Sequence, residues 1–423
     1  MNWLMEISEK KYVLSIYYSL VIFLFADSFA FSGFLPTTVS RATQLLCLIT
    51  IVFAYIRIKG WTNLKKMEVK WLIAITVLYT LWFIFKELWY GDIRSIAYEI
   101  IQGNKVLFAY MISIVILSLP NKKYFISILR VFFVGALLTI PLWLLNMDTL
   151  VIHNSFLGEQ IGGWLPFFAG FLLSLTICFH KKEQVLIWGI LGVYLLLMLL
   201  NARRNVCFSL SLYALIAFAF YMYHKRRDTL LVLMTCLLFG ISCCIISLNW
   251  DTLTHTTFRN MNSRLFEDTR SGVEREFFKD FKKASINEWL FGRGAEGTYY
   301  HSTPFYDNEK LIRHRPVIET GYLNLILKSG ITYMAVIILL ILVGAYRCLQ
   351  STNRYIKYIG AFLLTYMIDL YSANPLIPYS ARSTLFWFCI SIAFSKPYSQ
   401  AYLSQLANIL SNGKEWNDRE RIS

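Results

Sequence analysis

Apolar runs long enough to cross a lipid bilayer occur about twelve times in this chain, and they limit its fold more than any other feature. A hydrocarbon core of about 30 Å needs roughly 20 residues of helix. The runs therefore predict an all-α integral membrane protein with about 12 transmembrane helices. The expected spans are residues 13–32, 42–58, 71–88, 105–119, 126–146, 163–179, 185–200, 206–223, 229–249, 322–346, 358–373 and 383–396.

The composition agrees with this class of protein. Of the 423 residues, 57% are hydrophobic and only 16% are charged, whereas soluble globular proteins are about 25% charged. A formal net charge of +15 is compatible with a nucleic-acid partner, but a basic cytoplasmic face explains it better in a membrane protein. We therefore expect the lipid bilayer as the environment and no nucleic acid as a partner.

Nothing in the sequence indicates a metal or a cofactor. The eight cysteines lie in or beside apolar runs, without metal-ligand spacing to histidines, and we interpret them as small apolar fillers. No Asp-x-Asp motif occurs in the chain. The first apolar run follows Lys10 and Lys11 and has no small-residue cleavage site, so we expect it to be retained as the first span.

Basic and non-basic connections alternate between the predicted spans. The positive-inside rule places the basic connections in the cytoplasm, together with both termini. The basic connections are residues 59–70, 121–123, 180–183, 224–228 and 347–357. The remaining connections then face the outside, and they include 201–205 and the long segment 250–321. The chain thus divides into transmembrane helices 1–9 (1–249), a large periplasmic loop (250–321), transmembrane helices 10–12 (322–396) and a cytoplasmic tail (397–423).

The large loop is expected to contain short amphipathic helices. In SGVEREFFKDFKKAS (271–285), Ser271 followed by Glu274 has the pattern of a capping box. Phe277 and Phe281 fall on one face of the predicted helix. That face could lie on the outer membrane surface, or it could pack within the loop, and the pattern fits both. Farther on, GRGAEG (292–297) predicts a tight turn, because no βαβ unit surrounds it.

Arg203 and Arg204 face outward, against the charge bias of the other connections. Two guanidinium groups at a helix end can fork onto phosphate oxygens, and an anion available at that depth is the diphosphate of a polyprenyl lipid carrier. Alternatively, the long side chains simply reach the interface by snorkelling. The loop supplies further outward cations, among them Arg275, Arg293 and Arg315.

Glu319 stands where the loop enters the tenth predicted span. A carboxylate there could interact favourably with the helix dipole, or it could act as a general base toward a sugar hydroxyl. His314, five residues earlier, is the competing base. Asp27 and Asp369 lie within apolar runs without an obvious basic partner in the sequence. Because intramembrane carboxylates mark ion or proton paths, a transporter is the rival class.

In order and sidedness, these motifs resemble the bacterial O-antigen polymerase and O-antigen ligase superfamily, integral membrane glycosyltransferases of the GT-C type. Three stretches carry the match. NARR (201–204) resembles the family's Ser-Arg-Gly-like stretch at an outer helix start, and SGVERE (271–276) with LFGRGAEG (290–297) resembles its arginine helix and Gly-x-Gly turn. ETGYLNLILKSGI (319–331) resembles its His-Asn-x-Tyr-Leu segment, which enters the next helix. The likeness covers roughly residues 190–340. Glu319 replaces the histidine found in ligases especially, which favours a repeat-unit polymerase.

The resemblance implies a metal-independent, inverting transfer at the outer face of a bacterial inner (plasma) membrane. A growing glycan would pass from its polyprenyl diphosphate onto a new lipid-linked repeat unit of O-antigen, capsule or exopolysaccharide. The alternatives are a ligase, which transfers glycan to lipid A core, and a lipid-linked oligosaccharide flippase or exporter. The implied partners are polyprenyl-diphosphate-linked oligosaccharides, a chain-length regulator and a flippase. The expected site residues are Arg203, Arg204, Arg275 and Arg293 for the diphosphate, Glu319 and His314 for catalysis, and Tyr322 and Arg315 for the glycan.

Overall fold

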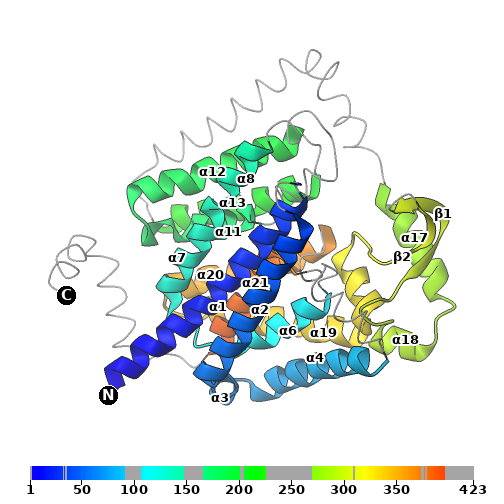
Figure 1. Ribbon diagram of the computed structural model, residues 1–423, viewed down its shortest axis with the longest axis horizontal. Coiled ribbons are helices and arrows are strands. Elements are labelled where there is room, and N and C mark those ends of the chain that lie inside the picture. The colour runs from blue at the N-terminus through cyan, green and yellow to red at the C-terminus, as the bar shows by residue number, and fades with distance from the viewer. Residues whose placement is uncertain are drawn as a thin grey trace, which may run out of the picture.

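The computed structural model describes residues 2–31, 33, 36–90, 106–146, 165–200, 204–224, 269–307, 310–372, 376 and 379–395 (Figure 1). This part of the chain is mostly helical. Its elements are α1 (Asn2–Phe31), α2 (Thr37–Ile58), α3 (Trp61–Leu64), α4 (Lys70–Tyr90), α6 (Val106–Ser118), α7 (Phe125–Leu137), α8 (Thr139–Leu145), α11 (Pro166–Leu172), the 3-10 helix η1 (Leu173–Cys178), α12 (Lys181–Leu200), α13 (Arg204–His224), α17 (Thr269–Phe281), α18 (Ile286–Phe291), β1 (Tyr299–Asp307), β2 (Lys310–Arg315), α19 (Gly321–Leu349), α20 (Arg354–Ser372) and α21 (Ala381–Phe394).

Helices of membrane-crossing length are present where the apolar runs predict them. Within the described residues, five segments are long and apolar enough to cross a membrane: Ile7–Ala30, Thr37–Ile58, Lys70–Trp89, Phe125–Leu145 and Gly321–Leu349. Shorter apolar helices lie at Val106–Ser118, Pro166–Thr176, Val206–Phe218 and Ala381–Phe394. These helices indicate a multi-pass membrane protein. The predicted ninth span, 229–249, lies outside the described residues, and the total of about twelve spans stays a prediction.

The helix α4 shows why a bilayer is the natural environment of the bundle. Its large apolar side chains Leu78, Trp82 and Trp89 are 65%, 52% and 70% exposed, whereas Phe83 on the other face is 2% exposed. A helix with such an exposed apolar stripe would be a liability in water. Facing lipid tails, the same stripe costs nothing, because the surroundings are equally apolar.

The helix α21 forms the centre of the bundle. All its residues from Ala381 to Phe394 are buried, polar ones such as Arg382 included, so other elements surround it on every side. Phe388 lies at the middle of an aromatic cluster, with its ring 5.2 Å from that of Phe132 and 6.1 Å from that of Phe171. Helices from both halves of the sequence therefore share one core.

Polar contacts join segments that the sequence analysis places on the same side of the membrane. At one end of the bundle, Arg347 forms an ion pair with Glu68, whose backbone N–H donates to the Phe394 carbonyl (2.8 Å). At the other end, Glu87 of α4 accepts a hydrogen bond from the Ala295 N–H (2.8 Å). We call this second end the loop end. The contacts agree with the predicted alternation of the spans, and the cytoplasmic location of both termini stays a prediction.

The segment 269–315, which we call the loop unit, comprises α17, α18, β1 and β2 beside α19 (Figure 1). The strands form an antiparallel hairpin in which Tyr299 pairs with Arg315 and Tyr306 with Leu311. The all-α prediction is therefore wrong in this segment. A signal for the hairpin was present, since YYHSTPFYD is rich in aromatic residues that favour strands, and Asp307 with the following Asn favours a turn.

Candidate functional site

The helix α17 buries its apolar face inside the protein. Phe277 and Phe281 are fully buried in a cluster with Tyr299 of β1 and with Leu323 and Leu327 of α19. Of the two alternatives that the sequence left open, packing within the folded chain is therefore the one present. This apolar cluster also joins the loop unit to the first turns of α19, which contain the predicted site residue Tyr322.

The capping box predicted at Ser271 is wrong. The helix α17 begins at Thr269, so Ser271 lies within its first turn. A capping box does occur at the start of α18, where the Glu288 N–H donates to Ser285 Oγ (3.3 Å) and the Ser285 N–H donates to Glu288 Oε2 (2.8 Å). This cap begins the short helix that leads into the Gly-Arg-Gly turn.

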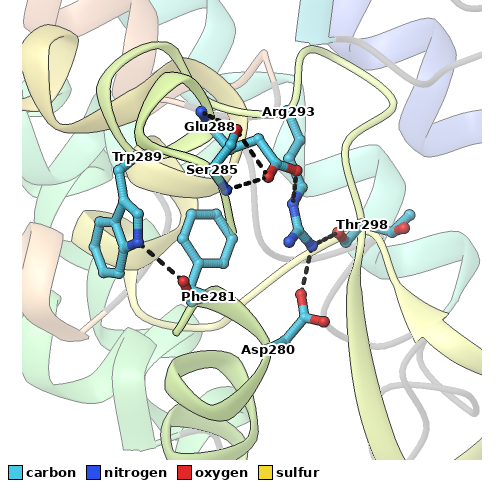
Figure 2. Close-up of polar contacts among 7 residues, drawn as sticks. All are labelled: Asp280, Phe281, Ser285, Glu288, Trp289, Arg293 and Thr298. Carbon is cyan, nitrogen blue, oxygen red and sulfur yellow. Dashed lines mark hydrogen bonds and ion pairs between the residues drawn. The ribbon is translucent and has the colours of Figure 1, made fainter. Parts of the chain in front are cut away.

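Arg293 holds the loop unit together (Figure 2). Its guanidinium forms ion pairs with Asp280 and Glu288, donates to the Thr298 carbonyl (2.7 Å) and lies 4.6 Å from the centre of the Phe281 ring. These contacts neutralise the charge of Arg293 and engage donors on its Nε and Nη1 atoms. The arrangement indicates a structural role, and we do not retain the predicted contact of Arg293 with diphosphate.

Replacing Arg293 with glutamine is expected to lower the free energy of unfolding by about 2 kcal/mol, because two carboxylates lose a charged hydrogen-bond donor. The measurement is thermal or denaturant unfolding of the purified protein in detergent. Arg275→Gln, at an exposed position of the same loop unit, is the matched control and should change stability by less than about 0.5 kcal/mol. Equal stability of the two variants would contradict the structural role.

The helix α19 is broken at Gly330, where φ is 82° and ψ is 171°. The carbonyls at the end of its first half are capped by the Gly-Arg-Gly turn: the Arg293 N–H donates to Leu327 O (2.8 Å) and the Gly294 N–H to Lys328 O (3.0 Å). The turn predicted from GRGAEG is thus present, docked at the helix break. Residues 331–349 alone extend about 28 Å, enough to cross a bilayer. The first half, 321–329, packs against both parts, with Leu327 in the loop-unit cluster and Leu325 in the bundle core.

Lys328 and Glu87 attach the loop unit to the bundle. Lys328 is 1% exposed, and its ammonium donates to the carbonyls of Ala295 (2.5 Å) and Gly297 (3.0 Å). The Ala295 N–H in turn donates to Glu87, so charges of opposite sign enclose one turn of backbone. Sequence reasoning missed both residues. The available signal was a lone lysine in the apolar run LNLILKSGI, since a buried ammonium needs polar partners.

Glu319 is exposed and immediately precedes Thr320, the N-cap residue of α19, whose side chain makes no capping hydrogen bond. Thr320 Oγ1 instead donates to Glu274 of α17 (2.5 Å). Arg275 and Glu319 are each the chain neighbour of one member of this pair. The contact therefore joins α17 to the start of α19 beside Arg275 and Glu319, which are 44 positions apart in the sequence.

Arg315 and Glu319 both act on the hydroxyl of Tyr299. Burial raises the pKa of Tyr299, the nearby Arg315 opposes that shift, and the Glu319 charge adds to it. His314 pairs with Tyr300 instead, with 5.7 Å between the ring centres, and is exposed. Because successive residues of a strand face opposite sides, His314 and Arg315 lie on opposite faces of the hairpin.

Two other carboxylates of the loop unit are poor proton acceptors near neutral pH. Hydrogen bonds from Lys279 and from Ser302 lower the pKa of Glu276 to about 2. The Ser285 N–H, with Arg293, lowers the pKa of Glu288. A general base works best when its pKa lies near the working pH. These two groups are therefore unsuited to activate a hydroxyl.

A second polar cluster lies at the loop end between α13, α20 and α21. Asp369 is completely buried and forms an ion pair with Arg382 (Nη1 to Oδ2 3.1 Å), and Ser209 donates to the same carboxylate. Ser209 is five residues after Arg204, the first residue of α13, which corresponds to about 7.5 Å along the helix. The Arg204 side chain and all of Arg203 lie outside the described residues.

Both intramembrane carboxylates have cationic partners. Asp27 lies 3.6 Å from Arg41 and accepts a hydrogen bond from Gln44 (3.2 Å), while Asp369 pairs with Arg382. Sequence reasoning missed these partners, which lie on neighbouring helices. Asp27 and Asp369, the two carboxylates that suggested a transporter, are therefore paired with arginines on neighbouring helices.

Tyr322 connects the two groups of residues. Its hydroxyl donates to the Met367 carbonyl of α20, two residues before Asp369. The start of α19 and the Asp369–Arg382 pair thus lie at the same end of the bundle. Within the part of the chain that the structure describes, no three His, Cys, Asp or Glu side chains are grouped as a metal site requires.

Comparison with known proteins gives no further guide to the site. No protein-family model and no curated protein matches the sequence. The resemblance to the superfamily therefore depends on the motifs, their order and their sidedness.

Proposed function

We propose that this protein is a polymerase of a bacterial surface polysaccharide, which transfers a growing glycan from polyprenyl diphosphate onto a new lipid-linked repeat unit. The observation that supports it best is the junction between α17 and the start of α19, formed by the Glu274–Thr320 contact. Arg275 and Glu319 are the chain neighbours of the two residues that form this contact, at one end of an apolar bundle. A lipid-borne diphosphate at the membrane boundary would present its phosphates at such a position.

In the proposed reaction, Glu319 takes the proton from the acceptor hydroxyl as the hydroxyl oxygen attacks the anomeric carbon of the donor. The bond from that carbon to the diphosphate oxygen breaks, and polyprenyl diphosphate departs with the bonding electrons. Attack from the opposite face inverts the anomeric centre. Arg203, Arg204 and Arg275 neutralise the charge that develops on the departing diphosphate, and this electrostatic role requires no metal.

The surroundings of Tyr299 favour Glu319 over His314 as the base. Arg315 and Glu319 share this neighbourhood, so Arg315 could orient the glycan beside the carboxylate. His314 lies on the other face of the hairpin. Tyr322 has its hydroxyl engaged by Met367, so a contact of Tyr322 with glycan would involve the aromatic ring.

Replacing Arg203, Arg204 or Arg275 with alanine is expected to reduce long-chain glycan at least about tenfold, because each change removes positive charge from the leaving-group site. The measurement is the glycan ladder on gels from cells with equal protein expression. Arg313→Ala is the matched control, since Arg313 is an exposed arginine of the same loop unit without an assigned role. Full ladders from all three variants would exclude the proposed roles.

Purified protein in liposomes with lipid-linked repeat units separates the proposed polymerase from its rivals. A polymerase lengthens the glycan on its carrier. A ligase transfers the glycan only when lipid A core is supplied, and a flippase moves the lipid without forming a glycosidic bond. Chain growth without other proteins would also show that a chain-length regulator and a separate flippase are not needed for the reaction itself.

A further inference from the structure

The cluster between α13, α20 and α21 contains hydroxyl groups that the described residues do not satisfy. Tyr213 and Tyr366 are 1% and 0% exposed, and neither hydroxyl has a hydrogen-bond partner among those residues. The charges of Asp369 and Arg382 act on both hydroxyls, so all four groups are neighbours. An unsatisfied buried hydroxyl is costly, and two beside one ion pair indicate an occupant that pairs with them.

Arg382 points to the same conclusion. Its Nη1 donates to both oxygens of Asp369 (3.3 and 3.1 Å), and its guanidinium lies 3.8 Å from the centre of the Phe167 ring. Among the described residues, Nε and Nη2 donate no hydrogen bond. The side chain retains 9% exposure, whereas that of Asp369 retains none. Asp369 thus holds one edge of the guanidinium and leaves the other edge for a ligand.

The unused groups are donors, and this identifies the chemistry of the ligand. Arginine N–H groups only donate, and tyrosine hydroxyls can donate. Asp369, the obvious acceptor, is already engaged by Ser209 and Arg382. Sugar hydroxyls would themselves require acceptors, whereas phosphoryl oxygens only accept. Both α13 and α21 also begin at the loop end of the bundle, beside this cluster, so the positive ends of their helix dipoles favour an anion there.

We propose that Arg382, Tyr213 and Tyr366 form a subsite for phosphoryl oxygens, set deeper than Arg204 along α13. Its occupant is a diphosphate group. The identity of that group as the headgroup of the lipid carrier rests on the proposed function, whereas the binding of phosphoryl oxygens does not. Arg382 and the two tyrosines would hold the phosphates from the bundle side.

The experiment measures Kd for full-length protein in phosphatidylcholine nanodiscs, with undecaprenyl diphosphate in one arm and inorganic pyrophosphate in the other. Tyr213→Phe combined with Tyr366→Phe removes only the two unsatisfied hydroxyls and keeps the ion pair. Asp369→Asn combined with Arg382→Gln removes both charges together, since losing one alone would leave a buried unpaired charge. Tyr358→Phe is the control: its hydroxyl is also buried in α20 but is already satisfied, because it donates to the Phe171 carbonyl (2.8 Å).

Both double variants are expected to raise Kd for undecaprenyl diphosphate at least about tenfold, with Tyr358→Phe unchanged. A rise in the pyrophosphate arm alone supports the subsite and assigns it to a free anion. Unchanged Kd in both arms, or no binding of either probe by the unaltered protein, overturns the proposal and leaves buried water as the occupant. Glycan chain growth is scored separately, so a failed subsite and a failed polymerase give different results.

Discussion

Alanine at position 330 is expected to lower the free energy of unfolding by about 3 kcal/mol or more. Gly330 has φ of 82° and ψ of 171°, a backbone conformation essentially restricted to glycine. A Cβ atom there would also overlap the Leu290 carbonyl and crowd the Phe291 N–H, which are backbone atoms of α18 and cannot rotate away. The helix break would have to change shape, and the docked Gly-Arg-Gly turn with it.

The control for Gly330→Ala is Gly189→Ala. Gly189 lies in α12 with open space around its Cα, so alanine there should be neutral or stabilise by up to about 1 kcal/mol. The two variants are compared by thermal unfolding in detergent and by chain growth in liposomes. If Gly330→Ala unfolds at the temperature of Gly189→Ala, the break does not depend on the glycine and the account of α19 is wrong.

Glutamine at position 319 is expected to reduce the rate of chain growth at least about 100-fold. The amide keeps the size and polarity of the side chain but cannot accept the proton of the acceptor hydroxyl. Because Glu319 is exposed, the substitution should leave stability nearly unchanged. A large loss of rate with normal folding would separate a chemical role from a structural one.

Two substitutions in the same loop unit serve as controls for Glu319→Gln. His314→Gln tests the competing base, which lies on the opposite face of the hairpin from Arg315. Glu276→Gln removes a carboxylate whose pKa is lowered to about 2 by hydrogen bonds from Lys279 and Ser302. Both should retain chain growth within about threefold of the unaltered protein, since neither is proposed to touch the acceptor. A greater loss in His314→Gln than in Glu319→Gln would reverse the assignment of the base.

Much of the helical framework could be predicted from the apolar runs, because burial in lipid requires a helix of a particular length regardless of its neighbours. The runs at 42–58 and 71–88 became the uninterrupted helices α2 and α4. The tight turn at GRGAEG was also predictable, since glycine is the residue that adopts positive φ without strain. Gly292 and Gly294 have φ of 71° and 88°.

The site was less predictable, because its geometry depends on contacts between distant residues. The Glu87–Ala295 hydrogen bond spans 208 positions, and no local pattern encodes it. Arg293 resembled any other outward cation in the sequence, and only the folded loop unit surrounds it with Asp280 and Glu288. The hairpin was missed because the long outer segment was read for helical periodicity alone.

The order of residues along this chain was sufficient to specify helices suited to lipid, the alternation of their connections and the presence of one long polar segment, since each follows from hydrophobicity and charge summed over a short window. Only the tertiary structure decided where α19 breaks, which arginines are already engaged and which carboxylates have partners. Those outcomes depend on packing and electrostatics between segments far apart in the chain, where desolvation makes a buried charge stable only beside a suitable partner.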